Sequence, residues 1–242
     1  GGANTTSTGA FEVANSCRYN DDDSPYMHIT PGSTGDEQKF TISFWVKRSA
    51  IGSGVYVLAS AFTGDNYDFI YFEADFLKVH HFNTPSYEYK ITTKRKFRDT
   101  SAWYHIVAAF DTTQSTAANR IKVYVNGTQE TDLEDTDYPD QNYDTFYNVT
   151  SRKLSIGSHI GPGSYFDGYL AEVVMTDGTQ YAASDFGEFD EDSPNIWKPK
   201  DVSGLTFGTN GFYLDFEASD NLGNDANGGT DLTEVNLAAA DQ

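Results

Sequence analysis

The feature that most constrains the fold is a series of short segments in which apolar side chains recur at every second position. The segment at residues 40–46 shows it clearly, with Phe40, Ile42, Phe44 and Val46 alternating with other residues. This period is typical of a β-strand with one buried face. Similar strand-like segments, alternating or apolar throughout, lie at residues 55–62, 67–72, 76–82, 87–91, 103–110, 121–125, 153–157, 169–175 and 212–216. Turn residues separate them, and Asn126-Gly127 is a strong signal for a two-residue hairpin.

This series predicts an all-β protein of about a dozen short strands. The longest helix that the sequence favours lies around residues 181–186 and would have one or two turns. Strands do not alternate with long helices, which argues against a parallel sheet. So many antiparallel strands must close into a barrel or pack as two sheets. We therefore predict a single antiparallel β-sandwich, and the 15% aromatic content favours the same class.

The length of 242 residues fits one large all-β domain. Residues 1–10 are small and polar, and we expect a flexible N-terminal arm there. The sandwich domain is expected to span residues 11–235, followed by a C-terminal tail at residues 236–242. Residues 128–150 are acidic, aromatic and poor in aliphatics, which predicts a long loop. Residues 188–204 are expected to be an extended segment packed on the surface.

Charge and cysteine content exclude several classes of protein. The chain has 36 acidic and 16 basic residues, which gives a formal net charge of −20. Nucleic acids and anionic membranes would be repelled, so neither is an expected partner. One cysteine, Cys17, excludes an internal disulfide framework and sites with several cysteine ligands. We expect Cys17 to be a buried thiol. No apolar run is long enough for a transmembrane helix.

Six ordered landmarks carry a resemblance to a known superfamily. They are NSCRYN at 15–20, FTISFWVKRS at 40–49, WYHIVAAFD at 103–111, IKVYVNGT at 121–128, LSIG at 154–157 and FDGYLAEVV at 166–174. Together they resemble the concanavalin A-like lectin/glucanase superfamily, in its laminin-G-like and pentraxin-like branch. The resemblance implies a jelly-roll sandwich of two antiparallel sheets. It places Trp45 and Trp103 among core and edge residues, and Gly168 where a side chain would crowd a neighbouring strand.

The C-terminal part narrows the resemblance. Its motifs are ASDFGEFD at 183–190, NIWKP at 195–199, GTNGFYLDF at 208–216 and DNLGND at 220–225. These resemble tailed-bacteriophage virion proteins, in which such a sandwich forms part of a tail fibre, spike or head decoration. The resemblance implies a non-enzymatic structural protein on the virion surface. Its expected partners are other virion proteins, a host surface glycan and further copies of the same chain.

Two other functions stay open, a free carbohydrate-binding lectin module, calcium-dependent in some members, and a β-glycan hydrolase. Retaining hydrolases need two carboxyl groups about 5 Å apart. Glu130, Asp132 and Glu134 match the superfamily's Glu-x-Asp-x-Glu pattern. Their neighbours lack the apolar alternation of a central strand, so we interpret these residues as a solvated acidic loop and expect no enzymatic activity.

Asp65 and Asn66 resemble the Asp-Asn pair of the pentraxin calcium site. Calcium takes six to eight oxygen ligands. The loop at 158–164, where pentraxins supply further acids, has none before Asp167. We therefore expect no cofactor, with calcium at Asp65 and Asn66 as the alternative.

An aromatic group within the long loop is the candidate contact site. Tyr138, Tyr143, Phe146 and Tyr147 alternate with Asp, Asn and Gln, and Tyr165 on a later loop could join them. This composition suits a bound sugar or a protein interface, while a plain loop is the third reading. Because the loop has few aliphatic residues, we expect its aromatic side chains to lie outside the core.

The histidines offer little catalytic potential. His80 and His81 are adjacent on one predicted strand and should point to opposite faces, so they cannot chelate together. His105 alternates with apolar neighbours and is expected to be a hydrogen-bonded strand residue.

Overall fold

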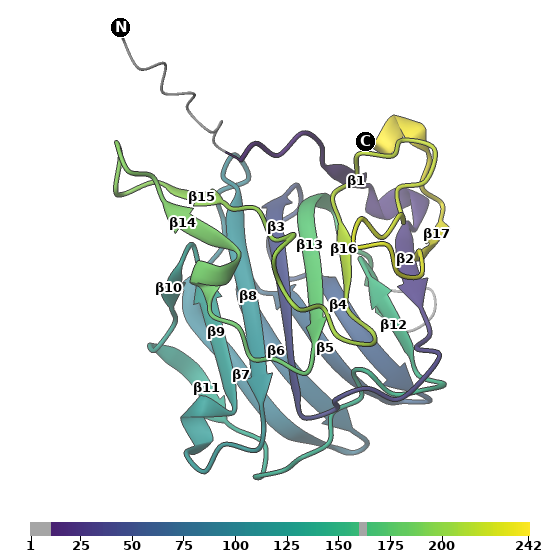
Figure 1. The fold of residues 1–242 in the computed structure, drawn as a ribbon. Helices are drawn as coiled ribbons and strands as arrows, with labels where there is room; N and C mark the ends of the chain where they lie inside the picture. Colours follow the sequence, from purple (N-terminus) through teal and green to yellow (C-terminus); the bar gives the residue numbers. More distant parts are fainter. Residues whose placement is uncertain (1–10, 160–163) are drawn as a thin grey trace, which may run out of the picture.

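The computed structural model describes residues 11–159 and 164–242, so the arm expected at residues 1–10 lies outside the described residues. Figure 1 shows a β-sandwich in which the helices are single turns. Its strands are β1 (Cys17–Tyr19), β2 (Tyr26–Ile29), β3 (Lys39–Arg48), β4 (Val55–Thr63), β5 (Asn66–Glu73), β6 (Phe76–Asn83), β7 (Ser86–Lys96), β8 (Tyr104–Asp111), β9 (Ile121–Val125), β10 (Thr128–Gln129), β11 (Leu133–Asp137), β12 (Lys153–Ile156), β13 (Gly168–Asp177), β14 (Gly187–Phe189), β15 (Trp197–Pro199), β16 (Phe212–Leu214) and β17 (Thr233–Val235). The helical turns are η1 (Asp21–Asp23), η2 (Ala117–Asn119), η3 (Ala183–Asp185) and η4 (Ala239–Asp241).

The strands form two large sheets and one small one. The 7-stranded sheet has the order β1-β13-β3-β8-β9-β10, with β16 also paired to β13. The 8-stranded sheet has the order β11-β7-β6-β5-β4-β12-β2-β17, and β14 pairs with β15. All pairings are antiparallel, as in β3 with β8 and β5 with β6. The expected two-sheet antiparallel sandwich is therefore confirmed.

The core lies between the two large sheets. Phe40, Ile42, Phe44 and Val46 on β3 are fully buried in one cluster, as their period of two predicts. Ile70 and its inward neighbours from the 8-stranded sheet join the same cluster. Each such side chain contributes about 1.5–3 kcal/mol to the free energy of folding.

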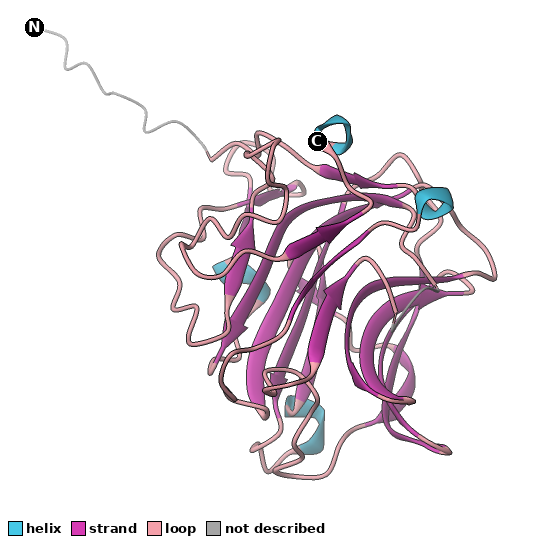
Figure 2. Ribbon diagram, turned by 90° about the vertical axis from the view of Figure 1, so that its right-hand side faces the viewer, coloured by secondary structure: helices cyan, strands magenta, loops and turns pink. Residues whose placement is uncertain are grey.

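The outer face of the 7-stranded sheet is also covered. The segment after β13 packs Ala183, Phe186, Val202 and Phe207 onto outward residues such as Val107 of β8. Trp197 on β15 is partly buried against this second cluster. The extended, surface-packed segment expected at residues 188–204 is instead a hairpin of β14 and β15 with an exposed turn, of which Trp197 and Val202 pack on the sheet. The helix expected around 181–186 is the single turn η3. Figure 2 shows the sandwich edge-on, with the covering loops on the left.

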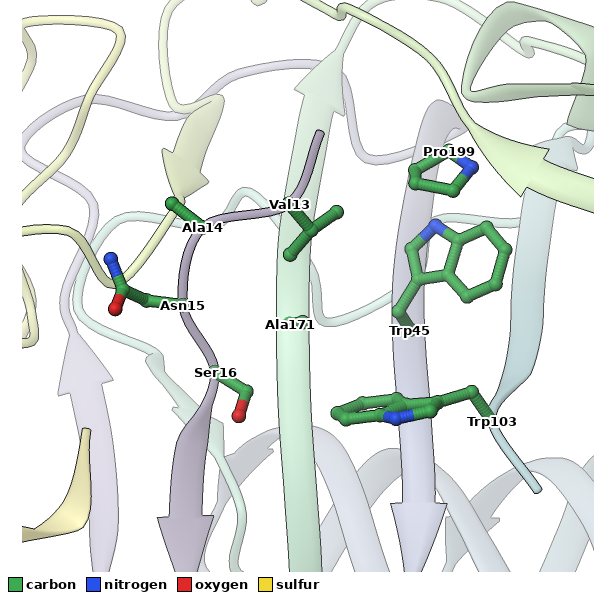
Figure 3. A pocket seen from close by; sticks show the side chains of 8 residues that line it. All are labelled: Val13, Ala14, Asn15, Ser16, Trp45, Trp103, Ala171 and Pro199. Carbon is green, nitrogen blue, oxygen red and sulfur yellow. The ribbon is translucent and has the colours of Figure 1, made fainter. Parts of the chain in front are cut away.

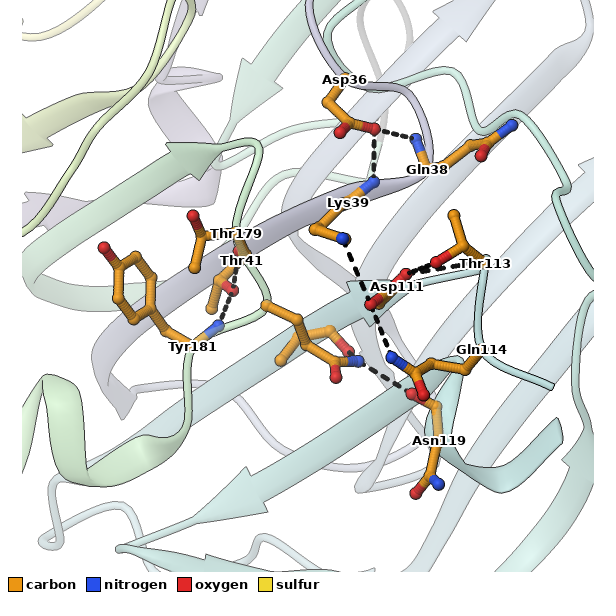
Figure 4. A network of polar contacts seen from close by, with 12 residues as sticks. Asp36, Gln38, Lys39, Thr41, Asp111, Thr113, Gln114, Asn119, Thr179 and Tyr181 are labelled. Carbon is orange, nitrogen blue, oxygen red and sulfur yellow. Dashed lines mark hydrogen bonds and ion pairs between the residues drawn. The ribbon is translucent and has the colours of Figure 1, made fainter. Parts of the chain in front are cut away.

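A polar network fixes the loops at one end of β3 and β8 (Figure 4). The Asp36 carboxylate accepts from the backbone N–H of Gln38 at 3.0 Å and of Lys39 at 2.8 Å. The Lys39 ammonium lies 3.6 Å from Asp111. Thr41 donates its hydroxyl to the Thr179 carbonyl at 2.9 Å and so holds the start of the covering segment. Side chains at the strand ends therefore position both the rim loops and the covering segment.

Two segments differ from the sequence expectation. Residues 128–150 contain β10 and β11, and β11 extends the 8-stranded sheet by pairing with β7. Residues 236–242, expected to be a free tail, are bound to the domain. Asn236 donates to the Asp23 carbonyl at 2.9 Å, and Gln242 donates to the Phe216 carbonyl at 2.7 Å. The acceptors are backbone carbonyls that irregular loops leave without partners. The amino-acid composition does not predict such hydrogen bonds.

Gly168 of β13 lies opposite Arg48 of β3. A Cβ added there would stand 2.2 Å from the Lys47 carbonyl oxygen, which confirms the crowding expected from the sequence. None of the helices in the described part of the chain is long and apolar enough to span a membrane.

Candidate functional site

The outer face of the 8-stranded sheet carries a second aromatic cluster. Val57, Phe69 and Tyr71 are buried there, with Tyr67 and Phe82 packed beside them. In the described residues no helix or strand outside the sheet packs across this surface, which we call the open aromatic face. Figure 2 shows the curved strands of this side on the right. The face contains a hollow of about 200 Å³ that is lined by Val55, Tyr67, Phe69, Tyr71, Glu73, Tyr87, His159 and Ser164.

Strand alternation places the hollow's aromatic rings. On β5, Asp68, Ile70 and Phe72 point into the sandwich, so Tyr67, Phe69 and Tyr71 point outward. The Phe69 and Tyr71 rings are stacked with centroids 4.0 Å apart, and Tyr67 meets Phe69 edge-on at 4.8 Å. These contacts hold the rings in one orientation and form a rigid apolar floor.

A chain of hydrogen bonds fixes the polar edge of this floor. Burial lowers the pKa of His80 to about 3, so its ring is neutral at pH 7. Its Nε2 lies 2.9 Å from the Thr92 hydroxyl, and its Nδ1 lies 3.0 Å from the Tyr71 hydroxyl. A neutral imidazole donates from one nitrogen and accepts at the other, so the ring bridges these two hydroxyl groups.

Charged groups beside the hollow are paired. Glu73 forms an ion pair with Lys78, its neighbour across β5 and β6. Lys90 lies 3.5 Å from both Asp135 and Asp137. These pairs leave the aromatic rings and hydroxyl groups around the hollow to contact a neutral polar molecule.

The structure corrects the expectation for the aromatic residues of the long loop. Tyr147 is fully buried in the main core and packs on Phe40 with ring centroids 4.9 Å apart. Tyr138, Tyr143 and Phe146 are partly buried against the same core. The expectation that these rings lie outside the core because the loop lacks aliphatics is wrong. The aromatic rings themselves supply the buried apolar surface.

Asp68 holds this loop in place. It is fully buried on the inward side of β5, where its carboxylate accepts from His81 Nδ1 and from the Tyr89 hydroxyl, both at 2.6 Å. Its second oxygen accepts from the backbone N–H of Phe146. The Tyr143 hydroxyl lies 3.2 Å from His81 Nε2 and completes the network. His81 thus points inward and His80 outward, as the sequence predicted.

Tyr165 lies apart from this network. Its ring contacts Tyr26 of β2, with centroids 6.4 Å apart. The structure thus places it against β2, whereas the sequence suggested that it could join the long-loop aromatics. Its role in a contact stays a prediction, as do those of Tyr138, Tyr143 and Phe146.

The proposed calcium pair does not fit a metal ion. Asn66 uses its amide oxygen to accept from the Thr84 backbone N–H at 2.8 Å, which joins two hairpin turns. Asp65 is exposed, and the described residues contain no group of three acidic, histidine or cysteine side chains that could hold a metal. Asp65 and Asn66 therefore act as turn residues in this structure.

The Glu-x-Asp-x-Glu match is not a catalytic strand. Glu130 pairs with Arg95 at 2.9 Å, and Asp132 pairs with Lys94 at 2.7 Å, both in the connection before β11. The pairing register of β11 with β7 shifts between Leu133 and Asp135, so Glu134 falls at an irregularity. The three carboxylates do not share one face of a regular strand.

Sequence reasoning missed the open aromatic face, although β5 carried a signal. Its letters NYDFIYFE place aromatic rings on both faces of one strand. A strand with one solvated face would alternate with polar residues. Aromatic rings on both sides therefore indicate a second face that is covered or bound.

His105 is a hydrogen-bonded strand residue, as expected. Its ring accepts a hydrogen bond from Trp197 Nε1 at 2.9 Å and lies 2.8 Å from the Ser43 hydroxyl.

Comparison with known proteins adds family and fold. The family model described as the concanavalin A-like lectin/glucanases superfamily matches residues 21–182. No curated protein matches this chain. Domain 4 of AbnA, a GH43 extracellular arabinanase from Geobacillus stearothermophilus solved in complex with arabinotriose, has a similar fold. Its TM-score is 0.51 at 14% identity, over 72% of this chain and 75% of that chain.

Two further structures have slightly lower scores. The native heptameric SAP-like pentraxin from Limulus polyphemus has a TM-score of 0.49 at 14% identity, over 71% of this chain and 80% of that chain. Domains LG4-5 of the mouse laminin alpha1 chain have a TM-score of 0.49 at 12% identity, over 80% of this chain and 48% of that chain.

Proposed function

The chain belongs to the concanavalin A-like lectin/glucanase superfamily, and on that premise we propose that it is a carbohydrate-binding domain. The observation that carries this proposal is the hollow of the open aromatic face. Tyr67 and Tyr87 offer ring faces to the C–H groups of a sugar, and their hydroxyl groups can meet sugar hydroxyls. Small-molecule sites typically combine such an apolar floor with a few fixed polar groups.

The pairing of charges on this face favours a neutral saccharide. A sugar carboxylate or sulfate would have to compete with Glu73 for Lys78, or with Asp135 and Asp137 for Lys90. A neutral sugar needs only the hydroxyl groups and the ring faces. Arabino-oligosaccharides are a first probe, because the similar arabinanase domain was solved with arabinotriose.

We propose binding without cleavage. Glycoside hydrolysis uses two carboxyl groups on either side of the scissile bond. Among the described residues that line the hollow, Glu73 is the one carboxylate, and Lys78 neutralises it. The proposal predicts no release of reducing sugar from any glycan that binds.

The test is a glycan array followed by calorimetric titration of the best neutral oligosaccharide. Tyr87 is 46% exposed, so Tyr87→Ala should leave the melting temperature nearly unchanged while weakening binding at least about tenfold. Ile51 is 47% exposed on a loop that does not line the hollow, and Ile51→Ala is the matched control. Absence of binding to all neutral glycans, or equal binding by Tyr87→Ala, would contradict the proposal.

We further propose that this domain is displayed on the surface of a tailed-phage virion, where a host glycan would be its ligand. The C-terminal motifs support this placement by resemblance. Two of them, at residues 183–190 and 195–199, form the covering segment on the 7-stranded sheet. Locating the chain in a density map of the purified particle tests the placement, and its absence from purified particles would contradict it.

A further inference from the structure

A second pocket lies on the opposite side of the sandwich, on the outer face of the 7-stranded sheet. This tryptophan pocket has a volume of about 360 Å³ and is lined by Val13, Ala14, Asn15, Ser16, Trp45, Trp103, Ala171 and Pro199. Figure 3 shows the two indoles one above the other with their ring planes turned relative to each other, and Val13 and Pro199 near Trp45. Trp103 is 37% exposed and Trp45 is 9% exposed, so an apolar wall is open to solvent. The sequence suggested core and edge roles for these residues, not a pocket.

Two cations border the tryptophan pocket. Strand pairing aligns Arg18 of β1 with Tyr169 of β13 and Lys47 of β3, one outward row beyond Ser16, Ala171 and Trp45. The Lys47 ammonium lies 5.9 Å from the Tyr169 ring centroid. Neither cation forms an ion pair with any residue that the structure describes. Arg18 is nevertheless close enough to Asp167 to affect the pKa of the Asp167 carboxyl group. An apolar pocket beside two free cations suits an acidic, apolar occupant.

The chain itself carries such a segment at the turn between β14 and β15. This acidic tip, residues 188–196, has the sequence EFDEDSPNI. Ile196 is 57% exposed, on the face of the hairpin opposite to Phe189, whose ring packs on Trp197 with centroids 4.9 Å apart. Glu188 and Asp190 pair with Lys198, whereas Glu191 and Asp192 have no ion-pair partner among the described residues.

The acidic tip is held rigid. The backbone N–H of Asp190 donates to the Ile196 carbonyl at 2.8 Å, and the Ile196 N–H donates to the Ser193 carbonyl at 2.8 Å. The Asp190 carboxylate accepts from the Ser193 N–H at 2.9 Å. At its base, Trp197 is tied to the sheet through His105. A segment that is already ordered loses little conformational entropy on docking.

We propose that the acidic tip of one copy of this chain docks into the tryptophan pocket of a second copy. Ile196 fills the apolar pocket, while Glu191 and Asp192 face Arg18 and Lys47. Pocket and tip lie close together on each molecule, because β15 ends at Pro199 in the pocket wall and begins beside the tip. The two contacts can therefore form reciprocally about a two-fold axis, which gives a closed dimer.

The experiment measures oligomeric state by analytical ultracentrifugation from about 1 to 100 µM. The wild-type chain should dimerise in this range. Trp103→Ala, or Ile196→Ser, should weaken the dimer at least about tenfold without lowering the melting temperature. Ile51→Ser changes an exposed apolar residue elsewhere and should leave the dimer intact.

A charge reversal in trans makes the test specific. Lys47→Glu alone, or Glu191→Lys with Asp192→Lys alone, should each yield monomers, because like charges then meet at both contacts. An equal mixture should form a heterodimer, because opposite charges meet at both contacts again.

A monomer at every concentration, or a dimer that survives these substitutions, would overturn the proposal. The proposal would also be overturned if the chain stayed monomeric and an acidic oligosaccharide protected Trp103 fluorescence from quenching. The pocket would then be a glycan site. The contact lies on the sheet opposite the open aromatic face. Tyr87→Ala should therefore weaken glycan binding at least about tenfold and keep the dimer.

Discussion

Replacement of Asp68 by alanine tests how the long loop is held. The carboxylate is fully buried and accepts hydrogen bonds from His81, Tyr89 and the Phe146 backbone. Asp68→Ala leaves three buried donors without an acceptor, each costing about 1–3 kcal/mol if unrelieved. We expect the free energy of unfolding to fall by about 4 kcal/mol, which lowers the melting temperature by about 8–16 °C in a chain of this size.

Two further variants calibrate this result in urea and thermal unfolding. Asp68→Asn keeps one acceptor oxygen but turns an amide N–H₂ toward a donor, so its loss should be smaller, about 1–3 kcal/mol. Asp65 is exposed in the preceding turn, and Asp65→Ala should change stability by less than about 0.5 kcal/mol. If Asp68→Ala costs less than about 1 kcal/mol, the carboxylate does not hold the loop and the reasoning is refuted.

Three other substitutions test separate features. Tyr147→Ala should lower the free energy of unfolding by about 3–5 kcal/mol, because this ring is fully buried. A near-neutral result in urea unfolding would instead indicate that the ring is exposed to solvent. Burial raises the pKa of Glu172 from 4.5 to about 7, so between these pH values the folded state binds more protons than the unfolded state and its stability falls as pH rises. Glu172→Gln should therefore gain stability relative to the wild type as pH rises through this window, and a difference between the two that does not vary with pH would contradict the shift. Gly168→Ala should cost about 1–3 kcal/mol, because its Cβ would meet the Lys47 carbonyl oxygen at 2.2 Å; unchanged thermal unfolding would show that the strands can separate there.

The sequence by itself determined the class of fold and the family. The period of two at Phe40, Ile42, Phe44 and Val46 marks a buried strand face whatever the neighbouring strands are, because side chains alternate across any pleated strand. The opposite directions of His80 and His81 follow from the same rule. The crowding at Gly168 was expected from the resemblance to the family, not from the period-two pattern.

Only the tertiary structure decided which faces are covered and which aromatic rings are exposed. Tyr147 and Tyr87 are both tyrosines among polar neighbours, yet Tyr147 fills the core and Tyr87 stands on an open face. The difference arises because Asp68, far away along the chain, draws the long loop over the open edge of the core. The tryptophan pocket likewise needs residues from β3, β13, the start of the domain and β15. Burial depends on contacts between distant segments, and local periodicity carries no record of them.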